Sequence, residues 1–169
     1  NNAQWGNIYS IVELKNGNIL AADYGNGIKT YNEKLNVFQP YYLNTKFSPN
    51  ELQVIYEDAS GNIWFGGRNQ LLRYSPSFYT IDNYLFSLIK NPTSYDNVTG
   101  ITQDGEGYLW AGVYSQGLFR IEPKTNNIQQ FDYNIYELNN FGRNIISNIY
   151  NDRYGVIWIG IWGKGVTKF

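Results

Sequence analysis

Few side chains in this sequence are of the types that usually carry out catalysis or metal binding. Histidine, cysteine and methionine are all absent from the 169 residues. Their absence removes imidazole acid–base chemistry, thiolate nucleophiles and zinc sites built from His or Cys. Carboxylates remain, and Glu57 and Asp58 form the only adjacent acidic pair. Neighbours on a strand point to opposite faces, so this pair cannot act on one bond, and we predict no catalytic site.

Three acidic residues recur at matched positions: Asp58, Asp104 and Asp152 each stand three residues before a glycine. Carboxylate oxygens suit calcium, so a calcium site is one interpretation. Each Asp, however, is alone in its own segment, without the dense carboxylates of a calcium loop. We therefore favour turn capping, in which the Asp side chain accepts hydrogen bonds from nearby backbone. No metal site and no cofactor is predicted.

Short polar segments that differ between the repeats could bind a ligand. They combine Tyr and Trp rings with amide, hydroxyl and cationic donors, and sugars are held by ring stacking together with several hydrogen bonds. The alternative is that these segments are ordinary polar loops. The candidate ligand-binding residues are Tyr24, Asn26, Arg68, Asn69, Gln70, Tyr114, Gln116, Trp162 and Lys164.

Internal repetition is the strongest pattern in the sequence. Four segments align on Gly17, Gly61, Gly107 and Gly155, with aliphatic residues nine and six positions before each glycine. Tryptophan stands three positions after the glycine in three of the copies. These offsets predict one domain, residues 1–169, with four repeats at approximately 1–41, 42–84, 85–133 and 134–169. The repeated tryptophans are Trp64, Trp110 and Trp158, and their fixed place in a strand favours core packing over a carbohydrate platform.

Each repeat predicts several short strands. Residues 62–66 are apolar on both faces, as in a strand that is covered on both sides. A small residue follows each tryptophan by two positions and leaves room for a neighbouring sheet. Four strands in roughly 45 residues are typical of a propeller blade. The predicted fold is all-β: a β-propeller with about four blades of four antiparallel strands.

The repeat resembles a known family. Residues 54–67, 149–160 and 91–98 resemble the two-component-regulator propeller repeat and its linker. The first copy departs from it, since Leu14 replaces Asp and Leu20 replaces Trp, and we expect a diverged blade that packs in the same way. The resemblance implies a periplasmic sensor region of a Bacteroidetes hybrid two-component system, ahead of a membrane helix and a histidine kinase. Such systems often respond to oligosaccharides.

The number of blades leaves two arrangements open. Residues 2–6 could supply the missing fourth strand of the last repeat and close a four-bladed ring. Alternatively, the chain is a piece of a propeller of about seven blades, which the family resemblance favours. An unclosed piece would expose two apolar blade faces, so it should associate with other blades or with a second copy of the chain.

The long connections between repeats should lie on the same face of the propeller as the candidate ligand-binding loops. They carry Tyr95, Tyr136, Phe141 and Arg143.

Three functions are compatible with these patterns. The favoured hypothesis is a non-enzymatic sensor module that binds an oligosaccharide; the second is a scaffold that dimerises a receptor; the third, least favoured, is a propeller lyase or glycosidase. The net charge of −1 and the lack of a basic stretch argue against nucleic-acid binding. The longest apolar run, residues 157–162, is too short to span a bilayer.

Overall fold

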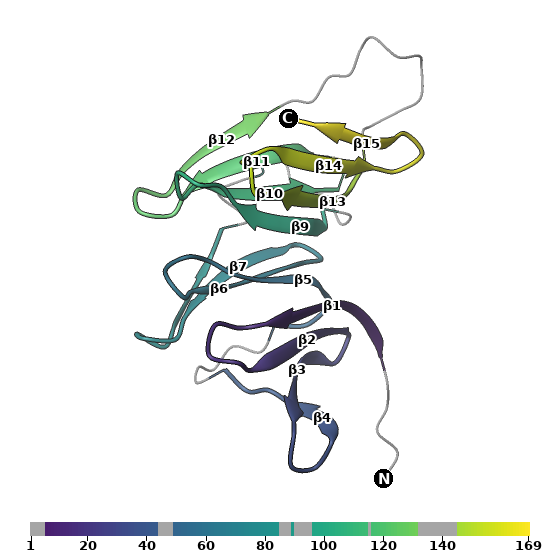
Figure 1. The fold of residues 1–169 in the computed structure, drawn as a ribbon, viewed down its shortest axis with the longest axis vertical. Helices are drawn as coiled ribbons and strands as arrows, with labels where there is room; N and C mark the ends of the chain where they lie inside the picture. The colour runs from purple at the N-terminus through teal and green to yellow at the C-terminus, as the bar shows by residue number, and fades with distance from the viewer. Residues whose placement is uncertain (1–5, 44–48, 85–88, 90–95, 115, 132–144) are drawn as a thin grey trace.

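The structure is a computed structural model that describes residues 6–43, 49–84, 89, 96–114, 116–131 and 145–169. Within these ranges the chain forms fifteen β-strands in four antiparallel sheets (Figure 1). Three sheets have four strands and the last has three. Within each sheet, consecutive strands are hydrogen-bonded neighbours, so each sheet is an up-and-down meander. The all-β prediction is confirmed.

The strand bounds follow the repeats. The first sheet contains β1 (Asn7–Glu13), β2 (Ile19–Tyr24), β3 (Gly27–Asn32) and β4 (Val37–Pro40). The second contains β5 (Leu52–Glu57), β6 (Ile63–Gly67), β7 (Gln70–Ser75) and β8 (Thr80–Asn83). The third contains β9 (Val98–Gln103), β10 (Leu109–Val113), β11 (Gly117–Glu122) and β12 (Asn127–Phe131). The fourth contains β13 (Ile146–Asn151), β14 (Ile157–Ile161) and β15 (Gly165–Lys168).

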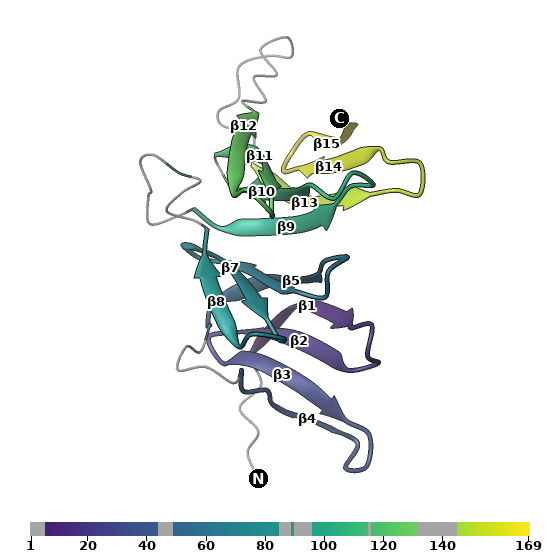
Figure 2. The same cartoon turned by 90° about the vertical axis from the view of Figure 1, so that its left-hand side faces the viewer.

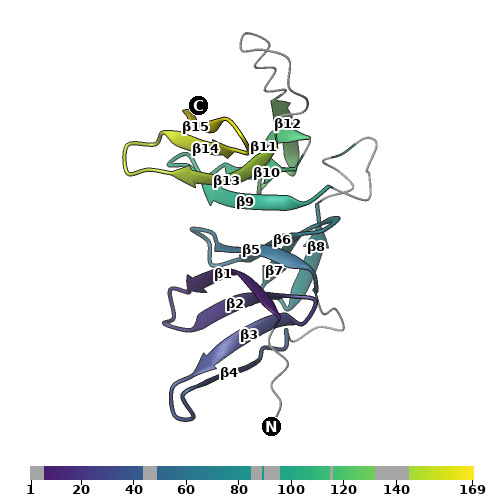
Figure 3. The ribbon, with the colours of Figure 1, turned by 90° about the vertical axis from the view of Figure 1, so that its right-hand side faces the viewer.

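The sheets are arranged as propeller blades. The first strand of each sheet contacts the first strand of the next, so β1, β5, β9 and β13 form an inner row (Figure 3). The first and fourth sheets lie at opposite ends of the molecule (Figures 1 and 2). Within the described part of the chain β15 pairs with β14 alone, and residues 2–5 of the proposed closing segment lie outside it. Among the described residues the four sheets form an open arc of blades (Figure 1).

A repeated aspartate fixes the first turn of the later three blades. The Asp58 carboxylate accepts hydrogen bonds from the backbone amides of Ser60 and Asn62, both at 2.9 Å. Its second oxygen accepts from Nε1 of Trp64 at 2.8 Å. Gly61 completes the turn with φ at +81°, a conformation that glycine adopts at little cost. The capping prediction is confirmed, and the same carboxylate also positions the tryptophan of the following strand.

The core consists of three apolar clusters, one between each pair of successive sheets. The tryptophan side of one sheet meets the aliphatic residues of the next sheet's inner strand. Gly66 allows this approach, since an added Cβ would lie 2.7 Å from a methyl group of Val98. The three clusters contain, respectively, Leu20, Ile28, Ile55 and Phe65; Trp64, Leu71, Ile101 and Phe119; and Trp110, Leu118, Ile149 and Ile159.

The tryptophan prediction is confirmed for two residues and wrong for the third. Trp64 is fully buried and Trp110 is 5% exposed, but Trp158 is 39% exposed. The physical reason is that the described residues contain no sheet after the fourth, so nothing covers the tryptophan side of β14. In the diverged first blade Leu14 and Leu20 are both buried in the core, as expected.

Candidate axial binding site

The inner strand of every sheet contains a β-bulge at the same position of the repeat. In each case the pairing skips one residue, directly after the first aliphatic residue of the strand. A bulge leaves its extra residue outside the ladder and re-aims that side chain. The four bulge residues are Tyr9, Gln53, Thr99 and Ser147.

The four bulge residues line one hollow of about 350 Å³. Because the inner strands lie side by side, this axial hollow receives residues from all four sheets. The turns that follow β10 and β14 add two rings, Tyr114 and Trp162. Among the described residues that line the hollow, none is charged. The surface therefore offers rings, amides and hydroxyls, which suit a neutral polar ligand.

Two hydroxyls of the hollow hold neighbouring sheets together. Thr99 donates through Oγ1 to the backbone carbonyl of Ile146 in the next sheet at 2.8 Å. The Ser10 hydroxyl accepts a hydrogen bond from the Ile55 amide at 3.2 Å, again across a sheet boundary. These bonds fix the spacing of the inner strands and hence the width of the hollow.

Other polar groups of the hollow have no partner within the described residues. The side-chain oxygen Oδ1 of Asn97 is buried without a hydrogen bond. A buried acceptor left in this state costs about 1–3 kcal/mol. The side chain of Gln53 likewise makes no hydrogen bond to the described chain and is available to a ligand.

The structure divides the predicted site residues into two groups. Tyr114 and Trp162 line the axial hollow. Tyr24 does not line the hollow but contacts a residue that does, since its ring centre lies 5.5 Å from that of Tyr9. The other candidates lie in turns between strands, except that Gln70 begins β7, and Lys164 is exposed in the turn between β14 and β15.

Most of the remaining candidates hold their own loops in place. Gln70 is buried and donates to the carbonyl of Asn50. Gln116 donates to the Asp96 carboxylate at 2.9 Å. Three further candidates have similar local roles: Asn26 donates to Asp23 at 3.1 Å, Arg68 pairs with Glu51 at 3.5 Å, and Asn69 takes a positive φ of 53° in its turn. The long-connection residues Tyr95, Tyr136, Phe141 and Arg143 lie outside the described residues.

The sequence analysis missed the bulge residues and Asn97. A signal was present, because the position after the first aliphatic residue holds a hydroxyl or amide side chain in every repeat: Tyr, Gln, Thr and Ser. A polar side chain at the same position of every inner strand marks a place where the strand does not alternate regularly. The pattern was hidden because a bulge changes which face a side chain occupies.

The residues whose pKa values are shifted lie away from the axial hollow. Burial raises the pKa of Tyr41, Tyr56 and Tyr84, so these phenols stay neutral. The hydrogen bond from Trp158 is the main cause that lowers the pKa of Asp152. None of the four lines the hollow, so its uncharged character does not depend on them.

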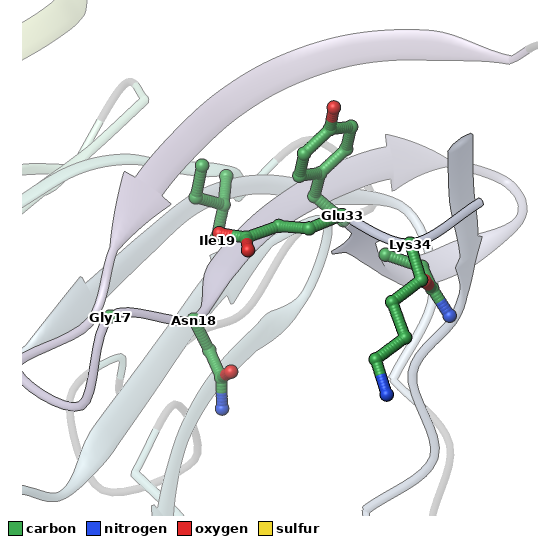
Figure 4. Close-up of a pocket in the computed structure, with 7 residues that line it drawn as sticks. Gly17, Asn18, Ile19, Glu33 and Lys34 are labelled. Atoms are coloured by element: carbon green, nitrogen blue, oxygen red, sulfur yellow. The ribbon is translucent and has the colours of Figure 1, made fainter. Parts of the chain in front are cut away.

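A second hollow, of about 410 Å³, lies on the first sheet (Figure 4). Gly17, Asn18, Ile19, Glu33 and Lys34, labelled in Figure 4, are among the residues that line it. Ile19 and Tyr31 line this hollow, and their counterparts one repeat later, Ile63 and Tyr74, are buried between two sheets. The second hollow is therefore part of a sheet face that lacks a neighbour, and we do not assign it a ligand.

The fold and the site together define a class of structure: an open arc of propeller blades with an uncharged axial hollow. The family model for the two component regulator propeller matches residues 46–69. A comparison with curated proteins finds no match. The family match covers part of the second repeat.

Solved structures with the same fold include two sensor-protein domains. The extracellular domain of the hybrid two-component system BT4673 from Bacteroides thetaiotaomicron is 26% identical, with a TM-score of 0.71 over 95% of this chain and 21% of that one. The corresponding domain of BT3049 is 22% identical, with a TM-score of 0.66 over 95% of this chain and 20% of that one. The chain therefore spans about a fifth of these domains.

An enzyme shares the fold as well. A catalytically inactive virginiamycin B lyase from Staphylococcus aureus is 21% identical, with a TM-score of 0.68 over all of this chain and 57% of the lyase. At that identity the likeness concerns the arrangement of the blades and not their chemistry. In the described part of the chain no helix is long and apolar enough to cross a membrane.

Proposed function

We propose that this chain is part of the periplasmic sensor propeller of a hybrid two-component system, and that its axial hollow binds a neutral oligosaccharide. The repeat and the similarity to two extracellular sensor domains support the first part. The observation that carries the second is the hollow itself: bulge residues from four sheets surround it, and a buried amide oxygen beside it has no partner.

The chemistry of the hollow favours a sugar over a charged ligand. The rings of Tyr9, Tyr114 and Trp162 offer apolar faces on which a pyranose can stack. The amides of Gln53 and Asn97 accept and donate hydrogen bonds, as sugar hydroxyls require. A phosphate or carboxylate would find no cation among the described lining residues. The volume falls near the lower end for small-molecule sites, which suits a short saccharide.

A ligand in this position contacts every inner strand at once. It would stabilise one spacing of the sheets over others, because a ligand favours the state to which it binds more tightly. The cross-sheet bonds of Thr99 and Ser10 are the contacts that such a change in spacing would alter. The sensor would in this way convert ligand binding into a change of packing between blades.

Titration calorimetry with a panel of neutral oligosaccharides tests the proposal. Trp162→Ala should weaken binding by about tenfold, equivalent to about 1.4 kcal/mol, because it removes a stacking surface. Tyr154→Ala is the matched control: Tyr154 is 76% exposed and Trp162 75%, but Tyr154 does not line the hollow. No heat with any saccharide, or equal weakening in both variants, would contradict the proposal.

Two alternatives have less support. A scaffold that dimerises the receptor would use the uncovered sheet faces and would show no ligand response. A lyase or glycosidase would need acid–base groups in the hollow, whereas the described lining residues include no carboxylate and the sequence has no histidine.

A further inference from the structure

A buried aspartate, Asp96, lies where the second and third sheets meet. It is 0% exposed and directly precedes Asn97, which lines the axial hollow. Burying a carboxylate is costly unless hydrogen bonds compensate for the lost water. The groups that bond to Asp96 therefore indicate what this residue does in the structure.

Asp96 bonds to turns of two different sheets. Its backbone carbonyl accepts a hydrogen bond at 3.0 Å from the amide of Asn69, in the turn between β6 and β7 of the second sheet. Its carboxylate oxygen Oδ1 accepts at 2.9 Å from Nε2 of Gln116, in the turn between β10 and β11 of the third sheet. One residue thus sets the position of the third sheet's turn relative to that of the second.

The turn of the third sheet is the one that presents Tyr114 to the hollow. The backbone amide of Tyr114 donates to the carbonyl of Asn97 at 2.7 Å. The turn is therefore bonded to residues 96–97 twice, through its main chain at Tyr114 and through the side chain of Gln116. These contacts fix the backbone from which the Tyr114 ring reaches the hollow.

The first sheet has a similar turn with a different contact. Tyr24 and Asn26 occupy the repeat positions of Tyr114 and Gln116. There the side-chain amide of Asn26 donates to Asp23 of its own sheet at 3.1 Å, and Tyr24 does not line the hollow. Of these two turns, the one whose amide bonds to Asp96 is also the one whose tyrosine lines the hollow.

We propose that Asp96 is a positioning residue, which through Gln116 holds the ring of Tyr114 at the axial hollow. Because Asp96 also bonds to the turn of the second sheet, a change in spacing between the second and third sheets moves the Tyr114 ring. For its ligand this inference rests on the proposed function, in which a neutral saccharide stacks on that ring. The position of the ring itself can be measured without a ligand.

NMR of the ligand-free protein with isotope-labelled tyrosine rings tests the positioning, with the Tyr114 signals assigned through Tyr114→Phe. Asp96→Ala removes the acceptor, so it should shift or broaden the Tyr114 ring signals. Asp96→Asn keeps an acceptor oxygen for Gln116 and should leave these signals close to those of the wild type.

Asp104→Ala is the matched control for this measurement. Asp104 caps the turn at the opposite end of β10, where its carboxylate accepts from the amides of Glu106 and Tyr108. Its loss should destabilise the third sheet without moving the Tyr114 signals. The proposal is overturned by unchanged signals in Asp96→Ala, by an equal change in Asp104→Ala, or by an Asp96→Asn variant as altered as Asp96→Ala.

Titration calorimetry with cellotriose, mannotriose and xylotriose measures the consequence for binding. Asp96→Ala should weaken the binding of these neutral saccharides by about fivefold, and in a Tyr114→Ala background it should have almost no further effect, because the ring that it positions is gone. Equal losses with and without Tyr114 would show that Asp96 acts by another route and overturn the proposal. If none of the saccharides binds the wild-type chain, the proposed function fails, and the ring signals alone decide the role of Asp96.

Discussion

Trp64 and Trp158 occupy the same place in their repeats but differ in burial. Each donates from Nε1 to its aspartate at 2.8 Å. Trp64 is nevertheless fully buried, while Trp158 is 39% exposed. The hydrogen bond is local to one blade, whereas burial requires the next blade. The residues of the repeat therefore determine the local geometry of each sheet. How much the tryptophan contributes to stability depends on whether a neighbouring sheet covers it.

The first blade lacks the hydrogen-bonded pair of aspartate and tryptophan. Leu14 and Leu20 stand where the other blades have Asp and Trp, and both are buried. The two positions have changed together, so the blade contains neither an indole without its acceptor nor a buried carboxylate without its donor. Leaving one such partner alone would cost more than replacing both.

The largest expected effect comes from truncating the two tryptophans. Trp64→Ala should lower the free energy of unfolding by about 3–5 kcal/mol, because it opens a cavity between two sheets. Trp158→Ala should cost less than half as much in the monomer, since nothing covers that ring. Urea denaturation of dilute protein compares the two variants. Equal losses would show that the difference in exposure has no energetic consequence.

A double-mutant cycle separates the local pair from its surroundings. Asp58→Leu should cost about 1–3 kcal/mol, because it leaves Nε1 of Trp64 and two turn amides without an acceptor. In the Trp64→Leu background the same change should cost less, since the indole donor is gone and the blade then resembles the first one. The coupling energy should be about 0.5–3 kcal/mol. Additive effects would contradict a direct interaction.

A smaller effect on the free energy of unfolding is expected from Arg73, which lies against the same tryptophan. The guanidinium of Arg73 lies 5.9 Å from the Trp64 ring centre and 5.3 Å from that of Tyr84. It also donates to the carbonyl of Pro123 in the next sheet at 3.0 Å. Arg73→Ala should cost about 1–2 kcal/mol in urea denaturation, because it removes the cation–π contacts, the hydrogen bond to Pro123 and the ion pair with Asp82 at 2.6 Å.

Arg73→Lys supplies the matched control for that variant. It keeps the positive charge but loses the planar fork that stacks and donates at once, so it should fall between the wild type and Arg73→Ala. A Lys variant as unstable as the Ala variant would show that stacking and forked donation matter more than charge.

Much of the fold could be predicted from spacing, while the site could not. Matched offsets around the glycines predicted the sheets, the buried Trp64 and the capping role of Asp58, because these depend on residues close in sequence. The exposure of Trp158 was missed because it depends on a sheet that the described chain does not contain. Gln53 was missed because a bulge, invisible to simple alternation, turns its side chain toward the axis.

The smallest effect concerns titration at the exposed end of the arc. The hydrogen bond from Trp158 holds the pKa of Asp152 below its ordinary value of 3.8. Since the folded pKa is depressed, the carboxylate's stabilising contribution is complete above the unfolded value. It is lost as the pH falls below about 3.8 and through the folded pKa. Trp158→Phe removes the donor, so the pKa of Asp152 should rise toward its ordinary value.

A carboxyl carbon NMR titration measures this shift directly. Tyr154→Phe is the control, because Tyr154 contacts the Asp152 carboxylate through its backbone amide, which the substitution keeps. An unchanged midpoint in Trp158→Phe would mean that the turn amides alone hold the pKa down. Retention of the lowered pKa in the wild-type monomer would show that the aspartate–tryptophan pair forms without any covering sheet. The hydrogen bond from tryptophan to aspartate, which Trp64 and Trp158 share, would then be shown to form whether or not the ring is buried.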